Sequence, residues 1–179
     1  REYPDDRLLR KSQTRAALSH LSNATVTFLD FKDEQLFLHI DRVAKKIEQI
    51  AISLKPEIIL IPFHGDNNQD HRAVYDSCCI AFRRFAIPFV SLIACYEIPS
   101  STDQALPGAR TPFTPNLFIP LTREDVRLKI EAFNFYTSEI RSDPHPRSNE
   151  NIENLAKMRG SLCNSKYAEC YSIQFEVRG

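Results

Sequence analysis

A chain of 179 residues with 42% hydrophobic side chains is long enough to bury one substantial core. Its 23 basic residues balance 23 acidic ones and are scattered along the sequence, so it lacks the electrostatic footprint of a protein that binds a phosphate backbone. We therefore expect no nucleic-acid partner. We also expect no membrane span, because no apolar run approaches the roughly 20 residues that cross a bilayer.

The cysteines and the first residues bear on the compartment. The five cysteines are odd in number, and Cys78 and Cys79 are adjacent in an apolar stretch, so we expect no disulfide framework and predict a reducing compartment. The polar opening Arg1–Asp6 does not form a signal peptide. These observations predict a cytoplasmic protein, unless a targeting segment preceded Arg1.

Helices alternate with short apolar strands along the chain. The clearest helix runs from Leu36 to Leu54, with apolar residues at three- and four-residue steps. It ends before Pro56, and Glu57–Pro62 is a short apolar run typical of a strand buried on both faces. The same reasoning predicts further helices over residues 10–21, 74–85, 126–135 and 152–156, and further strands over residues 25–29, 89–94 and 171–177.

This alternation predicts the fold class. Helices between apolar strands form an α/β sheet, mostly parallel, with helices on both faces. We predict a Rossmann-like three-layer sandwich in one domain covering residues 1–179. Residues 98–120 differ from the rest, with five prolines and little periodicity, and loops of this length in compact domains are often functional.

Polar side chains follow the predicted strand Glu57–Pro62. The loop His64–His71 carries carboxylates, amides and two histidines, and ligands in open α/β sheets bind outside the carboxyl ends of strands. An imidazole that binds a metal commonly donates its second ring N–H to a carboxylate, and either Asp66 or Asp70 is close enough in sequence. Two simpler interpretations remain open at this point. The aspartate can cap the next helix while His71 contacts solvent, and His64 can be a histidine that packs or that only supports a metal ligand.

Several motifs together resemble one family. From Arg10 onward the chain is similar to the PIG-L/LmbE family of zinc-dependent N-acetylglucosaminyl-phosphatidylinositol de-N-acetylases and their bacterial relatives. Arg10–Gln13 resembles the family's Arg-x-x-Glu helix, and Phe28–Asp33 resembles its strand ending in Leu-Asp. Asp66–Arg72 matches the family's Asp-x-(His/Asn)-x-Asp-His-Arg loop, and Tyr96–Thr102 resembles its Glu-x-x-Ser-Ser-Thr segment. Pro115–Phe118 resembles the Pro-Asn strand that follows, and Arg159–Gly160 together with Tyr167–Glu169 resembles the end of the family's sequences.

The resemblance implies an activity and a set of site residues. It implies zinc as cofactor, an N-acetylated amino sugar as substrate, and residues 98–120 as a loop over the substrate cleft. His71 resembles a zinc ligand, and Asp70 and Asn68 resemble catalytic residues, Asp70 by holding the loop and Asn68 by polarising the acetyl carbonyl with its amide. The implied substrate-binding residues are Arg10, Glu97, Ser100 and Ser101, although Glu97 could instead close a surface ion pair.

The sequence departs from the family at several positions. Gln13 replaces the usual Glu, and Gln104 stands where an aromatic residue often follows Ser-Ser-Thr. The family's leading strand ends in His-Pro-Asp-Asp-Glu, which supplies zinc ligands and the general base. These 179 residues contain no such segment, and we interpret Tyr3–Asp6, which resembles it, as a coincidence.

Two expectations follow from this departure. We predict a fold whose leading strand and helix are missing, so that a partner segment or subunit would cover the exposed surface. His71 is then the one residue that matches a zinc ligand of the family, and Asp66 or His64 could supply a second ligand. We therefore expect the fragment alone to be inactive. The alternative function is a non-catalytic carbohydrate-binding protein with the same fold.

Overall fold

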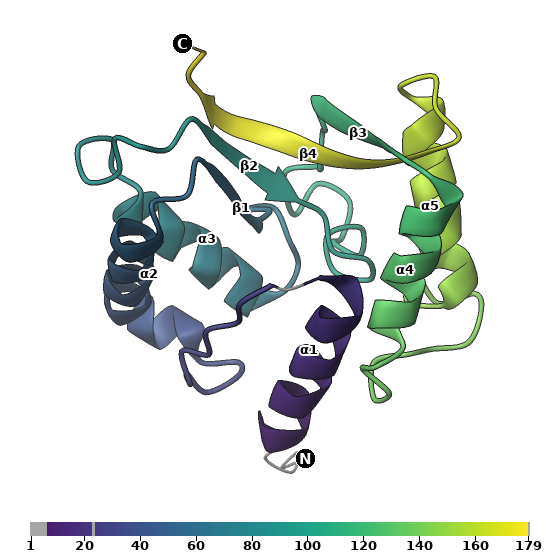
Figure 1. The fold of residues 1–179 in the computed structure, drawn as a ribbon, viewed down its shortest axis with the longest axis horizontal. Coiled ribbons are helices and arrows are strands. Elements are labelled where there is room, and N and C mark those ends of the chain that lie inside the picture. Colours follow the sequence, from purple (N-terminus) through teal and green to yellow (C-terminus); the bar gives the residue numbers. More distant parts are fainter. Residues whose placement is uncertain (1–6, 23, 179) are drawn as a thin grey trace. The chain divides into compact units, whose positions relative to one another are not determined.

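The computed structural model describes residues 7–22 and 24–178 (Figure 1). Tyr3–Asp6 lies outside the described residues. In chain order the elements are α1 (Arg7–Leu21), the 3-10 helix η1 (Leu36–His39), α2 (Ile40–Leu54), β1 (Ile58–Pro62), α3 (Gln69–Ala81), β2 (Leu92–Tyr96), β3 (Leu117–Leu121), α4 (Arg123–Phe133), α5 (Asn149–Ser161) and β4 (Tyr167–Glu176). None of the described helices is long and apolar enough to cross a membrane.

The strands form one four-stranded sheet in the order β1-β2-β4-β3. β1 pairs with β2 in parallel, and β2 pairs with β4 in antiparallel orientation. The α/β class is thus confirmed, but the sheet is mixed and the prediction of a mostly parallel one is wrong. The alternating pattern of residues 171–177 gives the faces of a strand and carries no information on its direction.

The chain divides into two compact units. The first contains the described residues of Arg1–Phe28 with Ile119–Glu169, and the second contains Leu29–Phe118 with the described residues of Cys170–Gly179. The prediction of a single domain stays a prediction.

The second unit contains the predicted helix–strand alternation. α2 packs on α3, and α3 packs on β1 (Figure 1). Their shared core consists of buried residues from both helices, from β1 and β2, and from the segments that follow them: Ala51, Ile61, Phe63, Cys78, Ile87, Val90, Ile93 and Cys95. This core fixes the carboxyl end of β1 against the start of α3. The polar motif Asp66–Arg72 lies at this junction.

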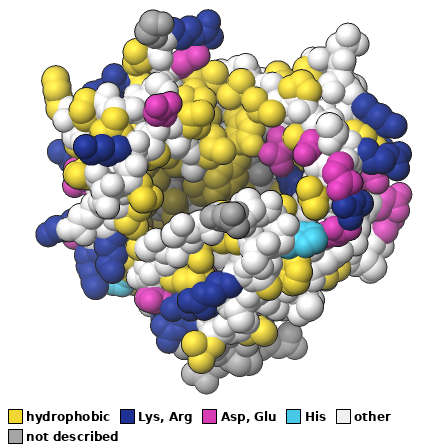
Figure 2. Space-filling model, in the orientation of Figure 1, with side chains coloured by type: hydrophobic (Ala, Val, Ile, Leu, Met, Phe, Trp, Pro, Cys, Tyr) yellow, Lys and Arg dark blue, Asp and Glu magenta, His cyan; other side chains and the backbone are white. Residues whose placement is uncertain are grey.

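β1 is less buried than its apolar sequence predicts. Ile61 is 5% exposed and belongs to the core, whereas Ile58 is 58% exposed and Leu60 is 46% exposed. Alternate residues of a strand point to opposite faces, and the described helices of this unit cover the face that carries Ile59 and Ile61. Figure 2 shows hydrophobic side chains gathered on the open face over β1 and β2. The prediction of a strand buried on both faces is therefore wrong.

The first unit consists mainly of helices. α1 packs against α4, and α4 against α5. Tyr167, at the start of β4, is 1% exposed and packs with Val126 and Ala156. Residues 25–29, which alternate like a strand, form no strand here. An alternating pattern provides suitable faces, but a strand also needs a neighbour to pair with, which the pattern does not specify.

Candidate functional site

The loop between β1 and α3 is built around the buried carboxylate of Asp66. This side chain is fully buried, and its Oδ1 accepts hydrogen bonds from the backbone N–H of Asn68 at 2.7 Å and from the Ser101 hydroxyl. Its Oδ2 accepts a hydrogen bond from the Thr102 hydroxyl at 2.7 Å. The Nδ1 atom of His71 lies 3.1 Å from Oδ1. Asp66 therefore joins the loop, the first turn of α3 and the segment after β2.

These hydrogen bonds determine the charge of Asp66. Burial disfavours its ionised form, but the contacts with His71, Ser101, the backbone of Asn68 and Thr102 outweigh that effect and hold the pKa of Asp66 below its ordinary value. The carboxylate is thus ionised at neutral pH. It faces an imidazole whose side chain is 27% exposed, so His71 has one nitrogen on the carboxylate and remains partly accessible to solvent.

Two further polar residues of the motif, Asn68 and Asp70, hold the start of α3. Asn68 is the N-cap, and its Oδ1 accepts hydrogen bonds from the backbone N–H of Asp70 at 2.8 Å and of His71 at 3.4 Å. The Asp70 carboxylate accepts hydrogen bonds from the backbone N–H of Glu34 at 2.6 Å and of Leu36 at 3.2 Å. Burial raises the pKa of Asp70 above its ordinary value, although those two hydrogen bonds act in the opposite direction.

The residues after β2 form a second segment that contacts the β1–α3 loop. Ser101 and Thr102 contact Asp66, while Ser100 is half-buried with a positive φ of 67°. Glu97 is half-buried and its Oε1 lies 3.2 Å from the Sγ of Cys170. The structure thus brings His71, Ser101 and the motif's backbone together, and places Glu97 and Ser100 a few residues along the same segment.

Arg10 belongs to the first unit. Its guanidinium is paired with Glu139 at 3.1 Å, and Glu139 also binds Arg147. Gln13 is 7% exposed and donates through Nε2 to the Thr137 hydroxyl at 3.2 Å. Within this unit, Arg10 and Gln13 thus connect α1 to the segment after α4.

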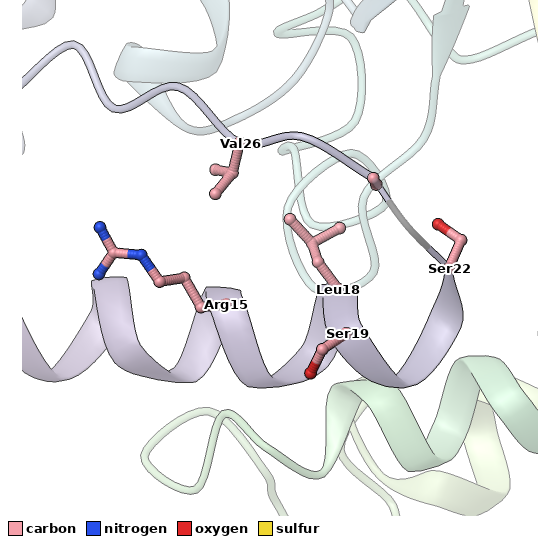
Figure 3. A pocket seen from close by; sticks show the side chains of 6 residues that line it. Arg15, Leu18, Ser19, Ser22 and Val26 are labelled. Carbon is pink, nitrogen blue, oxygen red and sulfur yellow. The ribbon is translucent and has the colours of Figure 1, made fainter.

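The first unit also has a pocket of about 360 Å³ beside α1 (Figure 3). Its lining consists of Arg15, Leu18, Ser19, Ser22, Ala24 and Val26. It contains no carboxylate and no imidazole, and none of the predicted site residues lines it. We therefore do not assign the site to this pocket.

The metal-binding capacity of the described residues is limited. His71 fits a zinc ligand, because a carboxylate engages one ring nitrogen and leaves the other for a metal. Among residues 7–22 and 24–178, however, no group of three or more His, Cys, Asp or Glu side chains is arranged to hold a metal ion. The arrangement fits one corner of a zinc site and not a complete one.

Some of these contacts were not predicted from the sequence. Asp66 was one of two possible partners of His71, and the structure selects it over Asp70. The sequence pattern alone indicates no role for Thr102. Its position directly after Ser101 in the Ser-Ser-Thr segment was the available signal, but nothing in the sequence relates that segment to residue 66.

Gly65 keeps this loop close to its neighbours. A Cβ at this position would lie 2.3 Å from the backbone oxygen of Thr111 and 2.5 Å from the Phe63 ring. We expect Gly65→Ala to lower the free energy of unfolding by about 1–3 kcal/mol, the usual cost of overpacking, in urea denaturation. The matched control is Gly108→Asn, where φ is 76°, no atom lies within 4 Å and Asn tolerates the left-handed conformation. An equal loss in both variants would contradict the steric explanation.

Comparisons with known proteins agree with the motifs. Residues 2–82 match the PIG-L family, described as GlcNAc-PI de-N-acetylase. No curated protein sequence gives a significant match. The following solved structures share the fold, all at low sequence identity.

The conserved protein TT1542 from Thermus thermophilus has a TM-score of 0.74 and 20% identity, with 96% of this chain aligned to 75% of that one. The N,N'-diacetylchitobiose deacetylase from Pyrococcus horikoshii has a TM-score of 0.69 and 16% identity, with 93% aligned to 63%. The 4-carboxy-2-hydroxymuconate hydratase GalB from Pseudomonas putida has a TM-score of 0.65 and 20% identity, with 99% aligned to 77%. The chain thus spans less than two thirds of the chitobiose deacetylase. Residues 2–82 thus match the PIG-L family, and the fold shared with these solved structures agrees with that match.

Proposed function

We propose that the protein is a zinc-dependent hydrolase that removes the N-acetyl group from an amino sugar or its conjugate. The observation that carries the proposal is the pair formed by buried Asp66 and partly exposed His71, at the carboxyl end of β1 within the residues that match the PIG-L family. The fold alone does not decide the reaction, because a hydratase shares it. One solved relative is a deacetylase of an acetylated sugar, as its name states, which supports this substrate class.

His71 is the residue that we propose to hold zinc, through its Nε2. Zinc at this position would act as a Lewis acid on the acetamide carbonyl and would favour ionisation of water. A catalytic zinc site has about three protein ligands, so the site needs ligands in addition to His71. The family's His-Pro-Asp-Asp-Glu motif contains such ligands and a general base, and we propose that catalysis depends on this motif.

The remaining residues have proposed roles that fit their positions. The Asn68 carbonyl oxygen is used in the helix cap, which leaves the amide N–H groups to donate to the acetyl oxygen. Asp70 holds the loop by accepting hydrogen bonds from two backbone N–H groups. Glu97, Ser100 and Ser101, all in the second unit, are the proposed contacts for sugar hydroxyls. Arg10 belongs to the first unit, and its contact with the substrate stays a prediction. The cytoplasm is the proposed compartment, supported by five free cysteines.

A second candidate is a protein that binds the acetylated sugar without cleaving it. One observation favours this candidate over the enzyme: the described residues contain no group of three side chains that could hold a metal ion. The two candidates differ in whether acetate is released.

The test compares two proteins. One is the chain of 179 residues, and the other, the lengthened chain, has the same residues preceded by a strand that ends in His-Pro-Asp-Asp-Glu. We expect little zinc and no turnover in the first. In the second we expect about one zinc per chain and release of acetate from N-acetylglucosamine conjugates, because a full ligand set gains the affinity that one ligand lacks. Zinc is measured by mass spectrometry and acetate by an enzyme-coupled assay. If the lengthened chain binds zinc and the sugar but releases no acetate, the non-catalytic candidate is correct.

A further inference from the structure

The buried carboxylate of Asp66 accepts several hydrogen bonds, although it is not the cap of α3. Asp66 receives hydrogen bonds from the backbone of Asn68 and from the hydroxyls of Ser101 and Thr102, and it also contacts His71. The two hydroxyls come from a segment that begins more than thirty residues later in the sequence. The carboxylate itself is fully buried, although its partners are only partly so, and hydrogen bonds to an ionised group are stronger than those between neutral groups.

The contact with His71 determines which ring nitrogen carries the proton. An ionised carboxylate only accepts hydrogen bonds, so the Nδ1 atom 3.1 Å away must be the donor. A neutral imidazole protonated at Nδ1 has its lone pair on Nε2. We propose that Asp66, Ser101 and Thr102 form a positioning network that holds His71 as the Nδ1–H tautomer with Nε2 free to bind a metal. This inference rests on the proposed function for the identity of the metal, but its tautomer claim concerns the protein alone.

The hydroxyl residues hold the carboxylate in place. Thr102 Oγ1 donates to Asp66 and also accepts from the backbone N–H of Ile98 at 2.8 Å, so it closes the turn of its own segment. The backbone N–H of Asn67 donates to the Ser101 carbonyl at 3.2 Å, which links the two segments a second time. Ser101 Oγ lies 3.4 Å from Nδ1 of His71 and has a single proton, which it gives to Asp66. Towards a sugar, Ser101 can then only accept a hydrogen bond.

The tautomer can be measured directly in the chain of 179 residues without metal. Long-range ¹H–¹⁵N spectra of histidine-labelled protein separate a protonated from an unprotonated ring nitrogen. We expect His71 to be protonated at Nδ1 in the original chain and to shift towards the Nε2–H form in Asp66→Asn, where the amide can donate to Nδ1. Thr102→Val should give a partial shift, and Thr102→Ser, which keeps the hydroxyl, should restore the original spectrum.

The matched control is Asp70→Asn, a carboxylate in the same motif whose hydrogen bonds go to Glu34 and Leu36. It should lower stability and leave the His71 tautomer unchanged. The inference is overturned if His71 is protonated at Nε2 in the original chain, a result that does not depend on any variant folding. It is also overturned if a folded Asp66→Asn chain keeps the original tautomer.

A second measurement separates this inference from the proposed function. In the lengthened chain, Asp66→Asn should weaken zinc binding by about 10- to 100-fold, the usual effect of removing an outer partner of a ligand. If the chain shows the Nδ1–H tautomer and loses it in Asp66→Asn but never binds zinc, the network stands and the proposed function fails. If zinc binds and needs His71, yet Asp66→Asn changes neither tautomer nor affinity, the network fails and the proposed function stands.

Discussion

Zinc binding and acetate release by the lengthened chain are expected to be lost when His71 is replaced with alanine. The variant removes the imidazole of the motif, whose Nδ1 contacts the Asp66 carboxylate and whose Nε2 is the proposed zinc ligand. A missing ligand should cost more than the about 10- to 100-fold loss that follows removal of an outer partner. Zinc stoichiometry by mass spectrometry and the rate of acetate release measure the two effects.

His39→Ala is the control for this prediction. His39 is half-buried in the same unit, and its ring lies beside Phe31 at 6.0 Å. We expect this variant to keep its zinc and its activity, with a small change in melting temperature. If the His71→Ala protein binds zinc as tightly as the original, the assignment of the metal to the β1–α3 loop is wrong.

The largest expected loss of stability comes from Phe63→Ala. Phe63 is 2% exposed, follows β1 directly and packs edge-to-face on Phe113 with ring centroids 5.1 Å apart. Truncating a buried aromatic residue costs about 3–5 kcal/mol, which is a large part of the about 5–15 kcal/mol that stabilises a typical domain. Urea denaturation followed by circular dichroism measures the free energy of unfolding.

Phe63→Leu keeps most of the volume and separates cavity formation from loss of the ring. We expect it to cost less than about 1.5 kcal/mol. The same ring also lies against His64, at 4.3 Å between centroids, so the alanine variant should loosen the start of the site loop. A loss below about 1 kcal/mol in Phe63→Ala would show that the cavity is filled by relaxation of its neighbours.

The sequence predicted the elements whose pattern is local. The apolar spacing of residues 36–54 specifies a helix, and the observed structure has η1 and α2 there. The position of the polar motif at the strand-to-helix junction was also predictable, because both flanking elements have clear patterns. The family match over residues 2–82 agrees with the motifs read between Arg10 and Arg72.

The features that failed depend on neighbours that a local pattern does not identify. Residues 25–29 alternate like a strand but have no strand assignment. Ile58 and Leu60 are exposed, since the described helices of their unit pack on the face that carries Ile59 and Ile61. The direction of β4 and the contact of Asp66 with Ser101 and Thr102 are long-range as well. Composition and periodicity contain no information on such pairings.

The shared carboxylate of Asp66 makes three positions in the sequence energetically dependent on one another. Once Asp66 is replaced, the hydroxyls of Ser101 and Thr102 lose their acceptor, so their removal should cost far less than it does in the original chain. The costs of these substitutions are therefore not additive. As homologous sequences diverge, a change at position 66 relaxes the constraint on positions 101 and 102, and the three residues should covary although the motif and the Ser-Ser-Thr segment lie far apart in the chain.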